Sequence, residues 1–401
     1  MLCIVIFKSI QNMDDILPLI FELKKIGVVS HTIFVANNMK TYGYIKENIV
    51  LYDGISSVGG SLTFFNRFNN RYLNLLFNIF ILRKCLYQKN ISIEMYRVDK
   101  WISILLACSR KVWKGKRIYS WIYNRPFRQA RNIIKYYELV GRGKDYSKEE
   151  WLKRYDCALL SFSRGQHEVI FGRKLTTDCP LVKIGYTRAL GEWKRYLATN
   201  AARYIPNEIK TPYIFFSIDS FGNWALKSDH ASYGEKFEEC LNVLKDINDD
   251  IMTVFKPNPR TDVSKAYEIL NLVGYKNYII SYAHPLILMD RAKFFFACHP
   301  TSLLIDAYFH GCHTVEYAHY DRRFYDYNKG QSLFLECVDS FIHRDVEKLK
   351  RVLNELVYND IPVERDFNRL RESCPILTSQ EVKEKFNWLM RNDGVDESHR
   401  I

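Results

Sequence analysis

Two turns in the second half of the chain combine residue types that bind phosphate. The sequence FKPNPRTD follows an apolar run typical of a strand, and it places Lys256 and Arg260 on either side of Asn258 in a Pro-Asn-Pro turn. The prolines stiffen the turn, and the two cations offer positive charge to an anion, the arginine by paired hydrogen bonds. A rigid turn with solvated cations is the alternative when this stretch is considered alone.

A second apolar run ends at His299, and Thr301 and Ser302 then begin a predicted helix in HPTSLLIDAYFHG. Hydroxyl groups and free backbone N–H groups at a helix N-terminus favour an anion. Asp306 lies one turn further on, where its carboxylate could accept hydrogen bonds from a ribose. An ordinary helix cap and a strand-end histidine are the alternatives. Two such turns in succession favour a nucleotide site.

The elements that position these turns alternate between strand and helix. LCIVIF and SHTIFVAN predict strands around the helix MDDILPLIFELKKIG, which Asp14 or Asp15 can cap, and NIVLYDG predicts a third strand. No G-x-G-x-x-G follows the first strand, so dinucleotide binding there is disfavoured. After a basic, helix-rich segment, DCALLSFS and CPLVKIGY predict further strands, and RALGEWKRYLA predicts a helix that leads out. PYIFFSI then begins a second alternating pattern, whose last predicted strand is HTVEYA.

The length and the pattern predict an α/β protein with two Rossmann-like domains facing a cleft, since 401 residues exceed one ordinary core. We assign residues 1–200 to an acceptor domain and residues 208–375 to a nucleotide-binding domain, with a polar linker over 199–211. Residues 376–401 are predicted to form a helix that packs back on the first domain. Ligands are expected in the cleft, at the carboxyl ends of the strands.

The tandem pattern, KPNPR and TSLLIDAYFHG together resemble GT-B glycosyltransferases, and more narrowly the bacterial Kdo transferases and sialyltransferases that use CMP-activated acidic sugars. The resemblance covers mainly residues 211–320. It implies that Lys256, Arg260, Thr301 and Ser302 hold the nucleotide phosphate. Asn258 stands where the family pattern has histidine. LVKIGYTRAL is similar to a strand end of CDP-glycerol-type polyol-phosphate transferases, which stay an alternative.

A transferase of this kind needs a carboxylate to activate the acceptor or attack the donor. Asp219, in FFSIDSFGNW, is the first candidate, and the Kdo transferases use an aspartate of this general location; a turn cap is its alternative role. Asp53, in LYDG, follows a predicted strand of the first domain. Glu168, in SRGQHEV, is the third candidate. The chain has no D-x-D triplet, so a metal-independent reaction without a cofactor is expected.

The net charge of +13 lies in one segment, because residues 63–144 hold 18 lysines and arginines against three acidic residues. The segment is also aromatic and apolar, which suits an anionic membrane surface. Its longest apolar run, YLNLLFNIFIL, is far shorter than the roughly 20 residues of a membrane span. A solvated basic face and a nucleic-acid partner are the alternatives, although no nucleic-acid-binding module is recognisable.

The ten cysteines are scattered without a C-x-x-C pair, which predicts reduced thiols in a cytoplasmic protein and no zinc site. The sequence therefore predicts a glycosyltransferase of bacterial surface polysaccharide or lipopolysaccharide, peripheral on the inner face of the cytoplasmic membrane. The expected donor is CMP-Kdo or a related acidic sugar, and the expected acceptor is a glycan or lipid-linked molecule. A polyol-phosphate transferase, a UDP- or GDP-hexose transferase and a non-catalytic scaffold stay open as alternatives.

Overall fold

The computed structural model describes most of the chain, namely residues 1–65, 67–68, 70–86, 88–95, 98, 100–113, 115–121, 154–161, 179–219, 221, 233–247, 250–258, 261–320, 322–327, 329–365 and 375–391. These residues form two compact units. Of the described residues, unit 1 contains 1–121, 154–196 and 375–391, and unit 2 contains 197–365.

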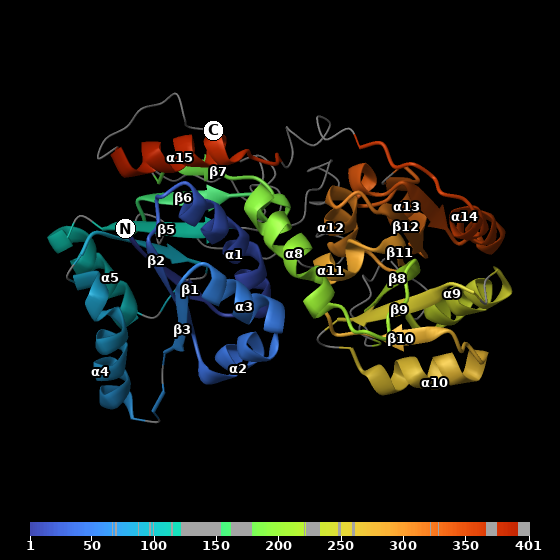
Figure 1. Ribbon diagram of the computed structural model, residues 1–401, viewed down its shortest axis with the longest axis horizontal. Coiled ribbons are helices and arrows are strands. Elements are labelled where there is room, and N and C mark those ends of the chain that lie inside the picture. Colours follow the sequence, from blue (N-terminus) through green and yellow to red (C-terminus); the bar gives the residue numbers. More distant parts are fainter. Residues whose placement is uncertain are drawn as a thin grey trace. The chain divides into compact units, whose positions relative to one another are not determined.

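Unit 1 is built on a parallel sheet of seven strands in the order β3-β2-β1-β4-β5-β6-β7 (Figure 1). Its strands are β1 (Leu2–Phe7), β2 (His31–Ala36), β3 (Gly60–Phe64), β4 (Asn90–Glu94), β5 (Lys116–Trp121), β6 (Cys157–Leu160) and β7 (Leu181–Lys183). Its helices are α1 (Ile10–Lys25), α2 (Met39–Glu47), α3 (Ile49–Ser57), α4 (Arg71–Leu82), α5 (Lys100–Trp113) and α15 (Ser379–Arg391), with short 3-10 turns at Arg83–Leu86 and Thr187–Ala189. Helix α8 (Gly191–Tyr204) passes from unit 1 into unit 2.

Unit 2 repeats this design with six parallel strands in the order β10-β9-β8-β11-β12-β13. The strands are β8 (Tyr213–Ile218), β9 (Met252–Pro257), β10 (Tyr278–Ile280), β11 (Ala292–Ala297), β12 (His313–Ala318) and β13 (Ser340–His343). The helices are α9 (Tyr233–Ile247), α10 (Val263–Val273), α11 (Pro285–Met289), α12 (Leu303–Phe309), α13 (Arg322–Tyr327) and α14 (Val346–Tyr358), with a 3-10 turn at Leu335–Cys337. The predicted fold class, two Rossmann-like α/β domains, is confirmed.

The main core of unit 2 lies between its sheet and helices α9, α10 and α14. All six residues of β8 are buried, which explains why YIFFSI is a continuous apolar run rather than an alternating one. Phe216 packs edge-on or tilted against Phe237, Phe255 and Phe296, which come from three different elements. This aromatic packing fixes the strands whose ends carry the candidate site.

Several sequence-based expectations about local structure are wrong. NIVLYDG is not a strand but lies in helix α3, capped by Asn48, whose side chain accepts a hydrogen bond from the Leu51 backbone N–H. Gly54 serves close packing there, since a Cβ at this position would come within 3.0 Å of a Leu17 methyl group. Asp53 is therefore on a helix and not at a strand end.

The cap of α1 is Ser9, and Asp14 and Asp15 are buried inside that helix. Both aspartates form ion pairs with Arg188, at 2.9 and 3.1 Å, and the Thr187 hydroxyl donates to the Asp15 carbonyl oxygen. Within unit 1 the GYTRAL stretch thus fastens α1 to the segment after β7.

The basic segment is not purely helical, because it contributes strands β4 and β5 to the middle of the sheet. Glu94 and Arg117 on these strands form a buried ion pair, and the Tyr155 hydroxyl donates to Glu94 at 2.7 Å. Burial raises the pKa of Glu94, while the hydrogen bond and charge of Arg117 act against that rise.

Strand β13 also follows HTVEYA, so β12 is not the last strand, and residues 199–204 belong to α8 rather than to a linker.

Helix α15 lies against α1 in unit 1. The Ser379 hydroxyl donates to Glu22 at 2.7 Å, and the Tyr186 N–H donates to the Pro375 carbonyl oxygen at 2.9 Å. Gly185 has φ +70°, and a Cβ there would lie 1.9 Å from that same oxygen, so the contact requires glycine.

Candidate functional site

The carboxyl edge of the unit 2 sheet is the natural place for a ligand. The order 3-2-1-4-5-6, counted from β8, reverses direction between β8 and β11, and open α/β sheets bind ligands at such a switch point. All pairings in this sheet are parallel, so the residues that follow each strand meet at one edge. The segments that follow β8, β9, β11 and β12 therefore lie where a ligand is expected.

The turn after β9 is joined to the end of β8. The Asn258 N–H donates to the Ile218 carbonyl oxygen at 2.8 Å, and the Thr261 N–H donates to the Asn258 carbonyl oxygen at 2.8 Å. These bonds hold the turn against the neighbouring strand and leave the Asn258 side chain exposed. Lys256 is paired in register with Ser217 of β8, and its ammonium group lies 5.9 Å from the Tyr282 ring centre. Arg260 lies outside the described residues.

Asp219 follows β8, and its N–H donates to the Tyr233 hydroxyl at 3.0 Å. The Tyr233 ring in turn lies edge-on to the His299 ring, with 5.6 Å between the ring centres. The structure therefore brings together Asp219, Lys256, Asn258 and His299, which the sequence had placed at separate predicted strand ends.

His299 is the most informative member of this group. His299 is only 7% exposed, and its Nδ1 atom has no hydrogen-bond partner among the residues that the structure describes. Buried polar atoms are normally hydrogen-bonded, because an unpaired one costs about 1–3 kcal/mol. The buried Cys298 thiol also interacts with the His299 side chain. A ligand group at this edge of the sheet would give that side chain a further partner at Nδ1.

The segment after His299 differs in part from the expectation. The Thr301 hydroxyl accepts a hydrogen bond from the Leu303 N–H at 3.3 Å, whereas Ser302 makes no side-chain cap bond. Helix α12 has seven residues, so its dipole is short. Asp306 is fully buried in this helix, so the prediction that its carboxylate could reach a ribose is not supported.

Sequence reasoning missed two further groups near this edge. His319 follows β12, and its Nε2 atom lies 3.1 Å from a Glu239 oxygen that also accepts a hydrogen bond from the Tyr317 hydroxyl. Burial lowers the pKa of His319, although the charge of Glu239 acts in the opposite direction. A histidine directly after an apolar strand, as in TVEYAHY, was the available signal.

The second group is a pair of buried charges, Lys236 and Glu316. Glu316 accepts hydrogen bonds from the Tyr320 hydroxyl, at 2.6 Å, and from the Ser332 hydroxyl. Burial raises the pKa of Glu316, while these bonds and the charges of His299 and Lys236 act to lower it. The charges of Glu316 and Lys236 thus oppose each other inside the domain, and Glu316 lies on β12, the strand next to β11 in the sheet.

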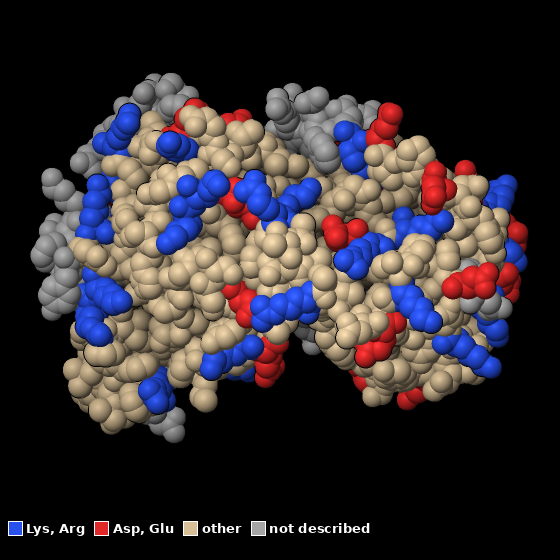
Figure 2. Space-filling view, viewed as in Figure 1, with Lys and Arg blue, Asp and Glu red and all other residues tan. Residues whose placement is uncertain are grey.

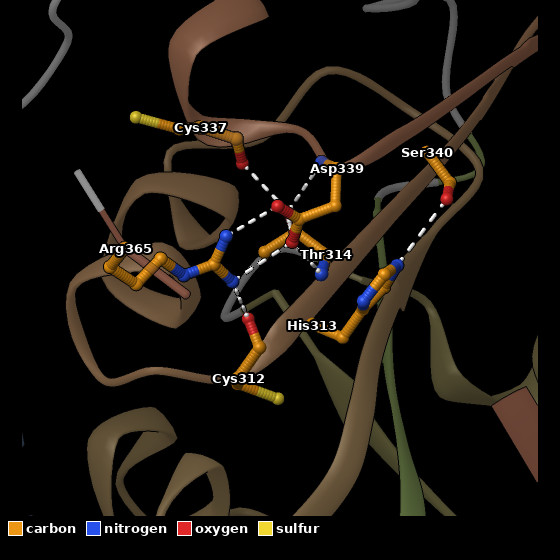
Figure 3. Close-up of polar contacts among 7 residues, drawn as sticks. All are labelled: Cys312, His313, Thr314, Cys337, Asp339, Ser340 and Arg365. Atoms are coloured by element: carbon orange, nitrogen blue, oxygen red, sulfur yellow. Dashed lines mark hydrogen bonds and ion pairs between the residues drawn. The ribbon is translucent and has the colours of Figure 1, made fainter. Parts of the chain in front are cut away.

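The opposite, amino edge of the sheet has a polar cluster of a different kind (Figure 3). Asp339 accepts hydrogen bonds from the Thr314 N–H and hydroxyl, at 2.8 and 2.9 Å, and from both terminal nitrogens of Arg365. Burial raises the pKa of Asp339, but the hydrogen bonds and charge of Arg365 outweigh that effect and lower it. Both oxygens of Asp339 are used within the protein, so this cluster stabilises the fold.

Two of the candidate carboxylates do not join the unit 2 group. Asp53 is a residue of α3 in unit 1, and Glu168 lies outside the described residues. Across the described ranges, no three His, Cys, Asp or Glu side chains gather in a group suited to a metal ion. None of the helices in those ranges has the length and apolar character of a membrane span.

Comparisons with known proteins support the fold. No protein-family model and no curated protein matches the chain. A protein described as a UDP-N-acetylglucosamine 2-epimerase from Listeria monocytogenes aligns with a TM-score of 0.52 and 10% identity, over 89% of this chain and 88% of that one. The wall teichoic acid polymerase TagF, in a structure soaked with CDPG, aligns with a TM-score of 0.52 and 14% identity, over 97% and 88%. At these identities the likeness establishes the shared GT-B-type fold.

Proposed function

We propose that this protein is a glycosyltransferase-type enzyme that transfers a sugar or polyol phosphate from a nucleotide-activated donor to a glycan or lipid-linked acceptor of the bacterial surface. The donor binds at the carboxyl edge of the unit 2 sheet. The observation that carries the proposal is His299, which is buried at the switch point and whose Nδ1 has no hydrogen-bond partner among the described residues. Lys256 lies on β9, on the other side of β8.

The chemistry assigned to each residue follows from its charge and place. Lys256 binds a phosphate oxygen, and His299 donates a hydrogen bond to the leaving phosphate as the bond to the transferred group breaks. Asp219 accepts the proton of the acceptor hydroxyl as its oxygen forms the new bond. Thr301 and Ser302 offer hydroxyl groups to the same phosphates. Asn258 can hydrogen-bond to the donor but does not transfer a proton at neutral pH.

Three classes of donor stay open from the sequence: a CMP-activated acidic sugar, a CDP-linked polyol and a UDP- or GDP-hexose. A CMP-activated acidic sugar follows from the sequence resemblance alone. One fold relative is named for a UDP-linked sugar and another was soaked with CDPG, which favours the polyol-phosphate and UDP-hexose alternatives. A donor with two phosphates also suits a site with Lys256 and His299 on different strands.

The test is a thermal-shift panel of CMP, CDP, UDP and GDP on the intact protein. A nucleotide at 100 times its dissociation constant should stabilise the fold by about 2.7 kcal/mol. The Lys256→Ala variant should lose most of this shift, and Lys265→Ala, an exposed lysine on α10, should keep it. A shift with CDP or UDP but not CMP selects the diphosphate donors.

No shift with any nucleotide would reject the donor site and favour a non-catalytic scaffold. An equal shift in Lys256→Ala and the parent protein would place the nucleotide elsewhere in the molecule.

A further inference from the structure

Helix α4 presents large apolar side chains on its outer face. Tyr72, Leu76 and Phe80 are spaced four residues apart, so they share one face of the helix, and they are 79%, 64% and 58% exposed. Leu73 lies beside them and is also exposed, whereas Asn78 and Leu82 on the other side are buried. A helix at a water-exposed surface ordinarily has polar side chains on its outer face. Packing within unit 1 therefore does not explain this face.

The apolar surface continues beyond the helix. Phe68, just before α4, is exposed, and its ring lies edge-on to Phe77 at 5.8 Å. Helix α5, which contacts α4, exposes Trp101 and Ile104, and the two helices lie together at one side of unit 1 (Figure 1). We refer to Phe68, Tyr72, Leu73, Leu76 and Phe80 as the α4 face.

Two arginines of the described residues lie against aromatic rings of the α4 face. The guanidinium of Arg83 lies 3.5 Å from the centre of the Phe80 ring, and that of Arg67 lies 5.9 Å from the Phe68 ring. The sequence has no acidic residue between Asp53 and Glu94, and Glu94 is buried against Arg117. In the view of Figure 2, the described residues drawn in colour over α4 and α5 are blue and tan.

We infer that the α4 face binds the anionic surface of a phospholipid bilayer, with α4 lying in the plane of the interface. Twelve residues of helix reach about 18 Å, which is too short to cross the roughly 30 Å hydrocarbon layer. Exposed Tyr, Trp and Phe rings suit the headgroup level, and Arg and Lys beside them attract anionic lipid.

Charge also argues against the other occupants of this surface. Two copies of the α4 face would bring like-charged basic rims together. A nucleic acid would contact the cations but leave the leucine and aromatic side chains without an apolar partner. A bilayer matches both the positive rim and the apolar centre.

The experiment is co-sedimentation of the full chain with lipid vesicles, either phosphatidylcholine alone or phosphatidylcholine with phosphatidylglycerol. We expect binding to the vesicles that contain phosphatidylglycerol, weakened by high salt. Leu76 and Phe80 are both exposed in the protein. Leu76→Glu and Phe80→Glu should each lower vesicle affinity about tenfold or more, because each removes apolar area that the bilayer would bury and adds a charge that repels anionic lipid. Leu272→Glu is the matched control, since Leu272 of α10 in unit 2 is 75% exposed, and it should bind vesicles as the parent protein does.

Equal vesicle binding by Leu76→Glu, Leu272→Glu and the parent protein would overturn the inference. So would vesicle binding by none of them, or a parent dimer that Leu76→Glu converts to a monomer without any vesicle binding. The surface belongs to unit 1 and the proposed donor site to unit 2. The nucleotide thermal shift therefore reports failure of the donor proposal separately, and it should be unchanged in Leu76→Glu.

Discussion

The two sheets share the order 3-2-1-4-5-6 over their first six strands, yet they use polar residues differently at the switch point. In unit 1 the turn after β1 is closed by its own side chains, since Asn12 accepts from the Lys8 N–H and the Thr41 hydroxyl donates to the Lys8 carbonyl oxygen. The Glu94 carboxylate, at the end of β4, accepts hydrogen bonds from Arg117 and Tyr155. In unit 2 the corresponding edge leaves His299 Nδ1 without a partner among the described residues.

Both units thus have the same kind of sheet edge, and we propose that only the unit 2 edge binds a ligand. Substitutions at the unit 1 edge are therefore expected to lower the stability of the fold, and substitutions at the unit 2 edge are expected to lower ligand affinity. The predictions below separate these two effects.

The largest effect is expected from Arg117→Met in unit 1. The change leaves the buried Glu94 carboxylate without its cation, which should lower the free energy of unfolding by about 3–5 kcal/mol. Urea denaturation followed by tryptophan fluorescence measures the loss. Adding Glu94→Gln to this variant should restore part of the stability, and a loss below about 1 kcal/mol would show that the pair is not isolated from water.

His299→Gln in unit 2 is predicted to weaken nucleotide binding by about tenfold to a hundredfold, which corresponds to losing one charge-assisted hydrogen bond. Stability should change little, because Nδ1 has no hydrogen-bond partner among the described residues. Isothermal titration with the nucleotide selected by the thermal-shift panel measures the affinity. His313→Gln, a change at the amino edge of the same sheet, is the matched control and should bind the nucleotide normally. The interpretation fails if both variants bind equally well.

The Arg365–Asp339 pair should give a pH-dependent effect of about 2 kcal/mol, the size of a charged hydrogen-bonded contact. The pKa of Asp339 is lower in the folded state than its ordinary value, so the pair stabilises the fold above pH ~4. That contribution disappears as pH falls through the folded-state pKa and the carboxylate takes up a proton. Urea midpoints of the parent and Arg365→Leu should therefore differ at pH 7 and converge in acid. The Arg365 guanidinium also lies 4.0 Å from the centre of the Tyr308 ring. A difference independent of pH would assign the effect to that packing instead.

Gly54→Ala in α3 is expected to have the smallest effect. Alanine favours a helix by about 1 kcal/mol, but its Cβ would lie 3.0 Å from a Leu17 methyl carbon and 3.4 Å from the Trp193 ring. We expect a net loss of about 0.5–1 kcal/mol, measured as a lower melting temperature. A rise in melting temperature would mean that Leu17 of α1 and Trp193 of α8 shift enough to accommodate the added methyl group.

The sequence predicted best where a strand is a continuous apolar run. LCIVIF, PYIFFSI and KFFFACHP are strands in the structure because burial on both faces leaves no place for polar side chains. Strand β5, KRIYSW, was missed because Arg117 reads as a surface residue until its partner Glu94 is known. That pairing joins residues distant in sequence, so no local pattern reveals it.

The candidate site was predictable in its positions more than in its contacts. Lys256, Asn258, His299 and Asp219 each follow an apolar run, and parallel pairing brings such ends to one edge. Two features depend on packing between elements: His299 Nδ1 has no hydrogen-bond partner among the described residues, and Lys236 is buried near the start of α9. Asp53 was misplaced because Asp-Gly usually marks a turn, whereas here the glycine allows two helices to approach.

The docking of Pro375 on Gly185 has a consequence for how the protein is made. Residues 375–391 complete unit 1, yet they leave the ribosome only after the whole of residues 197–365 has been synthesised. During translation unit 2 can therefore acquire its full set of strands while the first-formed sheet still lacks the helix that covers α1. Unit 1 therefore reaches its complete fold late, although most of its residues are translated before those of unit 2. Helix α15 completes a domain whose first strand was synthesised several hundred residues earlier.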